Sequence, residues 1–197
     1  METKLKIIAE IEKKPNGVHL REISRLVNSG LPNVKRFLGI LEEEKVVKRE
    51  KEANLVKFKL RESEKTSAYL KQVHTEKFIL LPSKIKIAVQ DFLNEMEIKP
   101  LIALIFGSYA KGNYNKESDV DVLLVFQKVE NEKDFESLAK RISMRTNTKI
   151  NPIYVNYKNF EKNFLDKNHD FSREIRQDVV IILGVEIYYH LLWRFLK

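Results

Sequence analysis

The chain has 197 residues, of which 43% are hydrophobic, and this is enough apolar content for one or two packed domains. It has no cysteine, which excludes disulfides and cysteine-ligated zinc. Its formal net charge of +8 fits a nucleic-acid partner, although a soluble surface rich in lysine and glutamate would explain that charge as well.

The sequence shows no sign of a membrane segment. No apolar run follows the first lysines, so we expect no signal peptide. The longest apolar stretch, residues 179–196, is interrupted by charged residues and by Gly184. We expect it to form a helix end, a turn and a buried strand rather than a membrane span. These features favour a soluble, cytoplasmic protein.

Residues 1–62 predict a small domain of three helices and a β-hairpin. Apolar residues recur at helical spacing in three segments, residues 2–14, 19–30 and 31–45. Residues 46–60 then alternate apolar and basic side chains around a turn at 51–54, which is typical of a hairpin. The basic excess is concentrated in this part of the chain, because residues 1–65 hold 16 Lys and Arg against 11 Asp and Glu.

Residues 63–82 predict a helical linker, and residues 83–197 predict a second domain in which strands and helices form a mixed sheet with helices on it. The predicted helices of this domain span residues 83–98, 132–145, 157–165 and 171–183. Its predicted strands span residues 100–106, 119–126, 149–155 and 185–192. The expected fold class is therefore mixed: α+β in the first domain and α/β in the second.

Two aspartates open the predicted strand at residues 119–126. Side chains at positions i and i+2 of a strand point the same way, so Asp119 and Asp121 project from one face while Val120 turns into the packing. Two carboxylates placed together attract a cation, and Mg²⁺ prefers carboxylate oxygens combined with water and phosphate oxygens. A two-metal arrangement for displacement at phosphorus is possible with this spacing.

A Gly-Ser pair ends the preceding strand. Gly107 lets a phosphate approach the backbone closely, and a helix expected to begin at Ser108 would offer free N–H groups and a hydroxyl. Lys111 and Lys116 are cations that could also meet a triphosphate. A nucleoside triphosphate bound with Mg²⁺ would satisfy both the Gly-Ser turn and the aspartate pair. If the segment is only a charged loop, Asp119 would be a turn residue and Asp121 an edge charge.

The Gly-Ser pair, ten intervening residues and an Asp-x-Asp between apolar strands resemble the signature of the DNA polymerase beta-type nucleotidyltransferases, and especially the minimal nucleotidyltransferases of prokaryotes. The resemblance covers about residues 83–190. It implies that the serine contacts phosphates and that the aspartates hold the metals for transfer of a nucleoside monophosphate. The nucleotide-binding candidates are Gly107, Ser108, Lys111 and Ser118, and the catalytic and metal candidates are Asp119 and Asp121.

Active members of this family usually carry a third carboxylate on a neighbouring strand. The corresponding strand here has Asn151 and Pro152, and asparagine cannot take a proton at neutral pH. Turnover is therefore an open question, and whether the chain is an enzyme is left undecided. Either the acceptor needs no protein base, or Glu117 or Asp170 reaches the site from a loop, or the domain only binds nucleotide.

Residues 18–60 resemble a winged helix-turn-helix of prokaryotic regulators. In such a domain the helix from Leu31 would enter the major groove of double-stranded DNA, and the hairpin would contact the backbone. The DNA-binding candidates are Asn33, Lys35 and Arg36 on the helix and Lys48, Arg49, Lys51, Lys57 and Lys59 on the hairpin. Winged helices also dock proteins, and the glutamates at 42–44 would repel phosphate if they faced it.

The two resemblances imply several partners. The triphosphate is expected to be ATP, and the acceptor of the nucleotide is a protein or small molecule. Small relatives act as antitoxins that adenylylate a HEPN-domain toxin, and winged-helix domains usually bind DNA as homodimers. The alternatives are a transcriptional regulator whose inactive transferase domain senses nucleotide, and a protein-docking adaptor.

Overall fold

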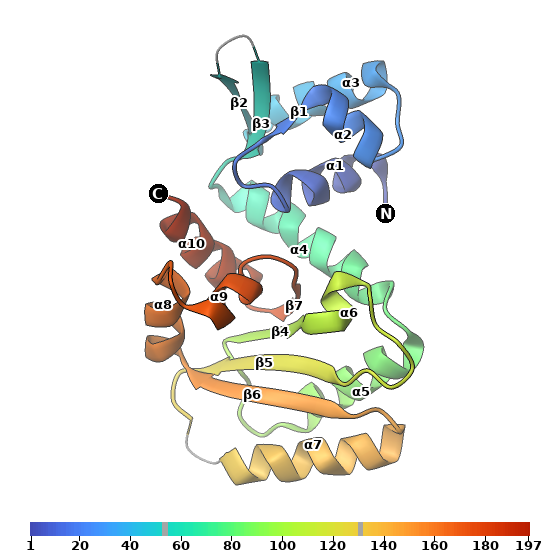
Figure 1. The fold of residues 1–197 in the computed structure, drawn as a ribbon, viewed down its shortest axis with the longest axis vertical. Coiled ribbons are helices and arrows are strands. Elements are labelled where there is room, and N and C mark those ends of the chain that lie inside the picture. Colours follow the sequence, from blue (N-terminus) through green and yellow to red (C-terminus); the bar gives the residue numbers. More distant parts are fainter. Residues whose placement is uncertain (53–54, 130–131) are drawn as a thin grey trace. The chain divides into compact units, whose positions relative to one another are not determined.

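A computed structural model describes residues 1–52, 55–129 and 132–197. The chain divides into two compact units, Met1–Glu76 and Lys77–Phe195, with the last two residues divided between them. Figure 1 shows the elements of each unit. No helix in the described part of the chain is both long and apolar enough to cross a membrane.

The first unit consists of helices and a small antiparallel sheet. Its helices are α1 (Thr3–Glu12), α2 (Leu20–Leu26), α3 (Leu31–Glu43) and most of α4 (Glu64–Ile79). Its strands are β1 (Val18–His19), β2 (Val47–Glu52) and β3 (Leu55–Leu60), in the order β1-β3-β2. The three predicted helices and the hairpin strands are confirmed. The two-residue strand β1 was not predicted, and residues 53–54 of the predicted turn lie outside the described residues.

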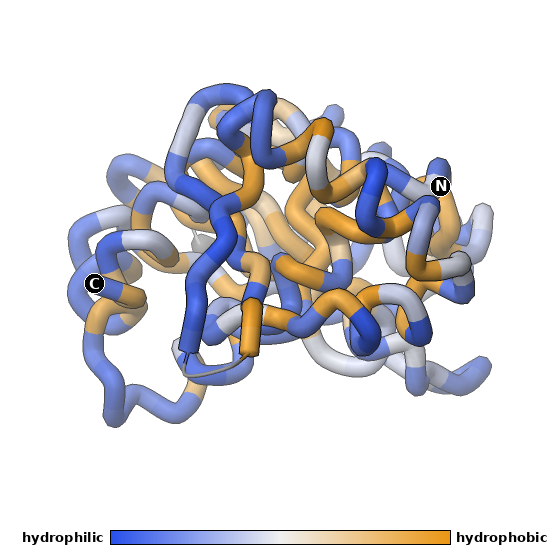
Figure 2. Tube along the Cα trace, turned by 90° about the horizontal axis from the view of Figure 1, so that it is seen from above, coloured by the Kyte–Doolittle hydropathy of each residue, from blue (hydrophilic) through white to orange (hydrophobic). Residues whose placement is uncertain are grey.

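The core of the first unit follows the helical periodicity. Ile7 and Ile11 of α1 and Leu38 and Leu41 of α3 are almost completely buried, because they recur on one face of each helix. The hairpin pattern is less regular. Figure 2 shows β2 as a mainly hydrophilic strand facing the hydrophobic start of β3, where Leu55 is 59% exposed.

The second unit is a mixed four-stranded sheet with helices. Its strands are β4 (Ile102–Phe106), β5 (Val120–Phe126), β6 (Ile150–Asn156) and β7 (Val180–Leu183). Its helices are α5 (Ser83–Glu95), α6 (Gly107–Lys111), α7 (Glu132–Thr146), α8 (Tyr157–Leu165), α9 (Asp170–Ile175) and α10 (Val185–Leu196). The strand order is β6-β5-β4-β7; β5 and β6 are parallel, and β4 is antiparallel to both of its neighbours.

The last part of the chain differs from the prediction. The predicted helix at 171–183 is a short helix, α9, followed by strand β7, and the predicted strand at 185–192 lies within helix α10. The β-branched run before Gly184 pairs with β4, whereas Tyr188 and Tyr189 are buried at helical spacing from Val185. Aromatic and β-branched residues favour strands only when they pack on a sheet. Tyr188 is buried on a helix, and its hydroxyl donates to the Ile175 carbonyl (2.7 Å).

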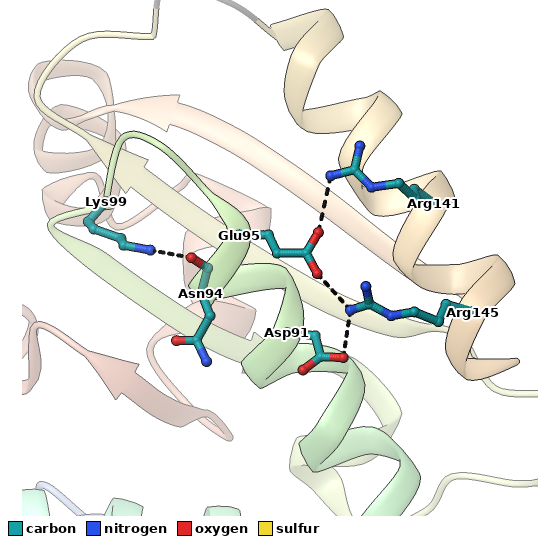
Figure 3. A network of polar contacts seen from close by, with 6 residues as sticks. All are labelled: Asp91, Asn94, Glu95, Lys99, Arg141 and Arg145. Atoms are coloured by element: carbon teal, nitrogen blue, oxygen red, sulfur yellow. Dashed lines mark hydrogen bonds and ion pairs between the residues drawn. The ribbon is translucent and has the colours of Figure 1, made fainter.

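One face of the sheet packs against α5 and α7. Val89 and Phe92 of α5 and Ile142 of α7 form one apolar cluster with Val122 and Leu124 of β5. The two helices are also joined by ion pairs at the surface (Figure 3): Arg145 bonds both Asp91 and Glu95 at 2.7 Å, and Arg141 bonds Glu95 at 3.1 Å. This packing holds the strands whose ends carry the candidate site.

Candidate functional site

Gly107 and Asp121 lie against each other where β4 ends and β5 begins. Phe106 is paired with Asp121 across the antiparallel strands, so the next residue of the chain, Gly107, turns over the aspartate. Gly107 has a φ of +68°, and a Cβ placed on it would lie 2.4 Å from Asp121 Oδ2. Only glycine fits this turn, because any side chain would both strain the backbone and collide with the carboxylate.

The two aspartates face one residue of the parallel strand β6 and one residue directly before it. Asp121 is in register with Asn151, whose Nδ2 donates to Asp121 Oδ1 at 2.9 Å. Two residues earlier on both segments, Lys149 Nζ donates to Asp119 Oδ2 at 2.5 Å. Asn151 therefore lies beside the aspartate pair, where a third carboxylate was expected. Its amide supplies a hydrogen bond there but no base.

Lys111 is held by an acidic side chain from another element. Its Nζ donates to Glu174 Oε1 of α9 at 2.6 Å. This hydrogen bond raises the pKa of Lys111, and the charges of Asp178 and Asp121 contribute in the same direction. Lys111 therefore carries a charged ammonium near Asp121, and that ammonium is already paired with Glu174. The proposed loop acid Asp170 is instead paired with Arg173 at 3.2 Å.

Ser118 belongs to the turn that leads into β5. Its Oγ accepts from the Asn115 backbone N–H at 2.9 Å, and its carbonyl accepts from the Tyr109 hydroxyl at 3.5 Å. Burial, together with the negative charge of Asp119 and the neighbouring Tyr114, raises the pKa of Tyr109. Ser118 therefore shapes the entry to Asp119, whereas Ser108 is half-buried in the first turn of α6.

A basic pocket of about 440 Å³ opens beside Asp119. We call it the lysine pocket, because four of the residues that line it are Lys84, Lys116, Lys140 and Lys149. Ser118 and Asp119 also line it, but Gly107, Ser108, Lys111 and Asp121 do not. The predicted site residues are therefore divided between two places that meet at the aspartate pair.

The aspartate pair is the part of the site suited to a metal ion. Within residues 1–52, 55–129 and 132–197, no three His, Asp or Glu side chains are placed to hold one together. Two carboxylates are nevertheless a suitable donor set for Mg²⁺, which keeps several waters and takes phosphate oxygens from its substrate. Asp119 and Asp121 would hold such an ion, with the remaining positions left to water and phosphate.

The predicted DNA-binding residues of the hairpin are mostly matched by glutamates. Arg49 bonds both carboxylate oxygens of Glu42 (3.1 and 2.7 Å), and Lys57 is paired with Glu52. Lys48 and Lys59 both lie 2.6 Å from Glu50 and lower the pKa of that carboxyl to about 2. The hairpin is therefore closer to neutral than its lysines indicate.

The helix α3 keeps its cations accessible. Lys35 and Arg36 are both exposed. Arg36 Nη2 donates to Asn33 Oδ1 at 3.1 Å, and Asn33 Nδ2 donates to Ser29 Oγ at 2.9 Å. Lys51, on β2, is exposed as well.

Two residues beside the site were not predicted, Lys149 and Glu174. Lys149 could have been found from the sequence, because it precedes its strand as Asp119 precedes β5, and parallel pairing in register brings the two together. Glu174 could not, because residues 171–183 were predicted to be a single helix with no relation to α6.

A match to a known protein family lies within the second unit. Residues 88–182 match the family described as Nucleotidyltransferase domain. The chain is similar to two proteins of Methanocaldococcus jannaschii. It is 33% identical to "Putative protein adenylyltransferase MJ0141" over 75 residues, which are 36% of this chain and 75% of that protein. It is 30% identical to "Putative protein adenylyltransferase MJ0604" over 100 residues, which are 46% of this chain and 90% of that protein.

A solved structure is also similar, a crystal structure described as a putative nucleotidyltransferase from Sulfolobus solfataricus. It is 22% identical, and the alignment covers 45% of this chain and 78% of that chain with a TM-score of 0.29. The family match at residues 88–182 includes the Gly107 turn, the aspartate pair and the strand of Asn151.

Proposed function

The chain belongs to the nucleotidyltransferase domain family, and from that premise we propose that it binds a nucleoside triphosphate with Mg²⁺ and transfers the nucleoside monophosphate to an acceptor. The observation that carries the proposal is the close approach of Gly107 to Asp121, which joins a phosphate-binding turn to a metal-binding carboxylate. The names of the two relatives support AMP as the transferred group and a protein as the acceptor.

Each residue has a distinct role in this proposal. The Gly107 turn and the Ser108 hydroxyl bind phosphate oxygens, and Asp119 and Asp121 hold Mg²⁺. When bound, Mg²⁺ neutralises the charge that develops on the phosphates during transfer. A hydroxyl oxygen of the acceptor bonds to the α-phosphorus, the bond from that phosphorus to the bridging oxygen breaks, and pyrophosphate leaves. The hydroxyl proton goes to solvent, since Asn151 takes none at neutral pH.

ATP labelled at the α-phosphate tests the proposal directly. The full chain or its Asp119→Ala/Asp121→Ala variant is incubated with labelled ATP, Mg²⁺ and lysate. We expect label on a macromolecule with the wild type only. An Asp134→Ala/Glu136→Ala variant, which removes the same charge from exposed positions of α7, serves as the control and should keep the activity. Label that appears equally with the aspartate-pair variant would contradict the proposal.

A second candidate function is a nucleotide-sensing transcriptional regulator without transferase activity. The hydrogen bond from Asn151 to Asp121 favours it, because an amide replaces the expected carboxylate at that point of β6. This function predicts that saturating Mg-ATP changes the affinity for DNA while no covalent product forms. Unchanged DNA affinity under those conditions would contradict it.

The first part of the chain is proposed to bind double-stranded DNA as a winged helix-turn-helix of residues 1–62, followed by a helical linker at 63–82 and the nucleotidyltransferase domain at 83–197. The order helix, helix, helix, hairpin and the exposed Lys35 and Arg36 support this proposal. The pairing of the hairpin lysines with glutamates makes α3 the main contact surface.

Two further partners rest on the family resemblance alone. As an antitoxin-like protein, the chain would modify a HEPN-domain toxin, and as a winged-helix protein it would bind DNA as a homodimer. Sedimentation of the purified chain tests the second point. A monomer at micromolar concentration in the presence of a palindromic duplex would contradict it.

A further inference from the structure

The lysine pocket gathers cations from four separate segments of the second unit. Lys84 lies in α5, Lys116 in the loop before β5, Lys140 in α7, and Lys149 directly before β6. These lysines are far apart in the sequence, so the fold, and not a local run of lysines, brings them to one pocket. The acidic residues that line the same pocket are Glu117 and Asp119, so cations outnumber anions there by two to one.

Three of the four lysines lack an anionic partner within the described residues. Lys149 is paired with Asp119, but no hydrogen bond or ion pair joins Lys84, Lys116 or Lys140 to another described side chain. The hairpin of the first unit shows the opposite arrangement, because Glu50 alone binds two of its lysines. Like charges around one pocket repel one another unless an anion lies between them. The lysine pocket therefore favours an anion with several charges.

The floor of the pocket is preformed. Ser143 Oγ donates to the Ala139 carbonyl (2.7 Å) and accepts from the Ile150 N–H (3.1 Å), which ties the end of α7 to β6. Thr148 is only 5% exposed, and Tyr109 is 3% exposed. Since the polar groups of the floor are largely occupied, the lysines on the rim are the groups left to bind a ligand.

We propose that the lysine pocket binds a ligand with two or more phosphate groups, at a place separate from the Gly107–Ser108 turn. Lys149 links the pocket to the metal-binding pair, because a phosphate group competes with Asp119 for its ammonium. The phosphates belong either to the nucleoside triphosphate itself or to a second, phosphorylated substrate. Only the link to Asp119 rests on the proposed function; the binding of phosphate does not.

Inorganic tripolyphosphate, titrated calorimetrically into the full chain in the presence of EDTA, tests the pocket without metal or catalysis. Lys84→Gln/Lys140→Gln removes two rim lysines. The matched control, Lys86→Gln/Lys133→Gln, removes the same charge from the same two helices outside the pocket. We expect the pocket variant to bind at least tenfold more weakly and the control to stay within twofold of the wild type. No binding by the wild type, or equal weakening in both variants, would overturn the proposal.

The link through Lys149 has its own pair of variants. Asp119→Asn releases Lys149, whereas Glu117→Gln removes one carboxylate from the same pocket without an ion pair to break. We expect Asp119→Asn to tighten tripolyphosphate binding severalfold more than Glu117→Gln does. Equal effects would show that the general charge of the pocket, and not Lys149, is responsible, and would remove this part of the proposal.

Competition identifies the source of the phosphates. If Mg-ATP displaces tripolyphosphate, the pocket binds the phosphates of the nucleotide; if both bind together, it binds those of a second substrate. Asp121→Asn separates this proposal from the proposed function, since Asp121 does not line the pocket. A variant that loses Mg-ATP binding but keeps tripolyphosphate binding supports both. A chain that binds tripolyphosphate but never transfers a nucleotide contradicts only the proposed function.

Discussion

Asp121 is the residue where most of the local constraints meet. Gly107 covers one carboxylate oxygen, Asn151 donates to the other, and the ammonium of Lys111 lies close enough for each charge to affect the other. These neighbours come from two different elements, α6 and β6. A change in any of them should therefore alter the position or the charge of one carboxylate, and two substitutions separate these effects.

Gly107→Ala is expected to displace Asp121. The new Cβ would meet the carboxylate at 2.4 Å, and the positive φ by itself costs about 1 kcal/mol or more for alanine. Gly112→Ala is the matched control, because Gly112 has a similar φ of +74° but no atom within 4 Å of the added Cβ. We expect both variants to lose stability in urea, and only Gly107→Ala to lose Mn²⁺ binding measured by electron paramagnetic resonance.

Asn151→Asp tests whether the amide limits metal binding. A third carboxylate in place of the 2.9 Å hydrogen bond would repel Asp121 and lower the free energy of unfolding at pH 7 by about 1 kcal/mol without metal. Mg²⁺ should then raise the melting temperature of this variant more than that of the wild type. Asn151→Ala, which loses the hydrogen bond without adding charge, should show no such gain. An equal Mg²⁺ effect in all three proteins would exclude a metal-binding role for this position.

At the scale of elements, the packing of α5 against α7 supports the strands of the site. Glu95 accepts from both Arg141 and Arg145 (Figure 3), and these hydrogen bonds hold the pKa of its carboxyl below the ordinary value of 4.5. A carboxyl whose pKa is lowered in the folded protein stabilises the folded state at pH values above its ordinary pKa of 4.5. That contribution is lost as the pH falls through the lowered pKa.

Glu95→Gln should therefore flatten the dependence of stability on pH. At pH 7 the variant is expected to melt at a lower temperature than the wild type, and the difference should shrink as the pH falls below 4.5. Glu97→Gln, which removes a nearby charge that has no ion pair within the described residues, serves as the control. Thermal melts between neutral and acidic pH check this prediction, and a constant difference across that range would contradict it.

At the scale of the whole molecule, the proposed activities lie in different units. The exposed cations of α3 belong to Met1–Glu76, and the aspartate pair belongs to Lys77–Phe195. If DNA binding and nucleotide binding are independent, each can be removed without the other. If the chain is a nucleotide sensor, they are coupled.

Lys35→Gln/Arg36→Gln is expected to weaken duplex binding and to lower the slope of log K against log salt by about 2, because each lost phosphate contact removes about one released counterion. Mg-ATP binding should not change. Asp121→Asn should weaken Mg-ATP binding and leave duplex binding unchanged. Fluorescence anisotropy with a labelled duplex measures the duplex binding of both variants. Lys86→Gln/Lys133→Gln serves as a control of equal charge. Loss of duplex binding in the control as well would show that only the overall charge matters.

Hydrophobic periodicity and residue spacing predicted most of the secondary structure and the location of the candidate site. The three helices of the first unit, the strands β4, β5 and β6, and the pairing of a Gly-Ser turn with two aspartates all depend on neighbours along the chain or on strand alternation, so the sequence alone predicted them. The sequence also shows an asparagine and not an acid at position 151, because finding that position requires only knowing which strand follows β5.

Tertiary structure decided the rest. Where the sequence predicted a helix at 171–183 and a strand at 185–192, the chain forms a short helix, a strand and a second helix, because pairing with β4 and burial of Tyr188 and Tyr189 outweigh local propensity. The glutamates that pair with the hairpin lysines, the contact of Glu174 with Lys111, and the lysine pocket are similar cases. They bring together charges from separate elements, and a linear sequence carries no information on such distances until the sheet is assembled.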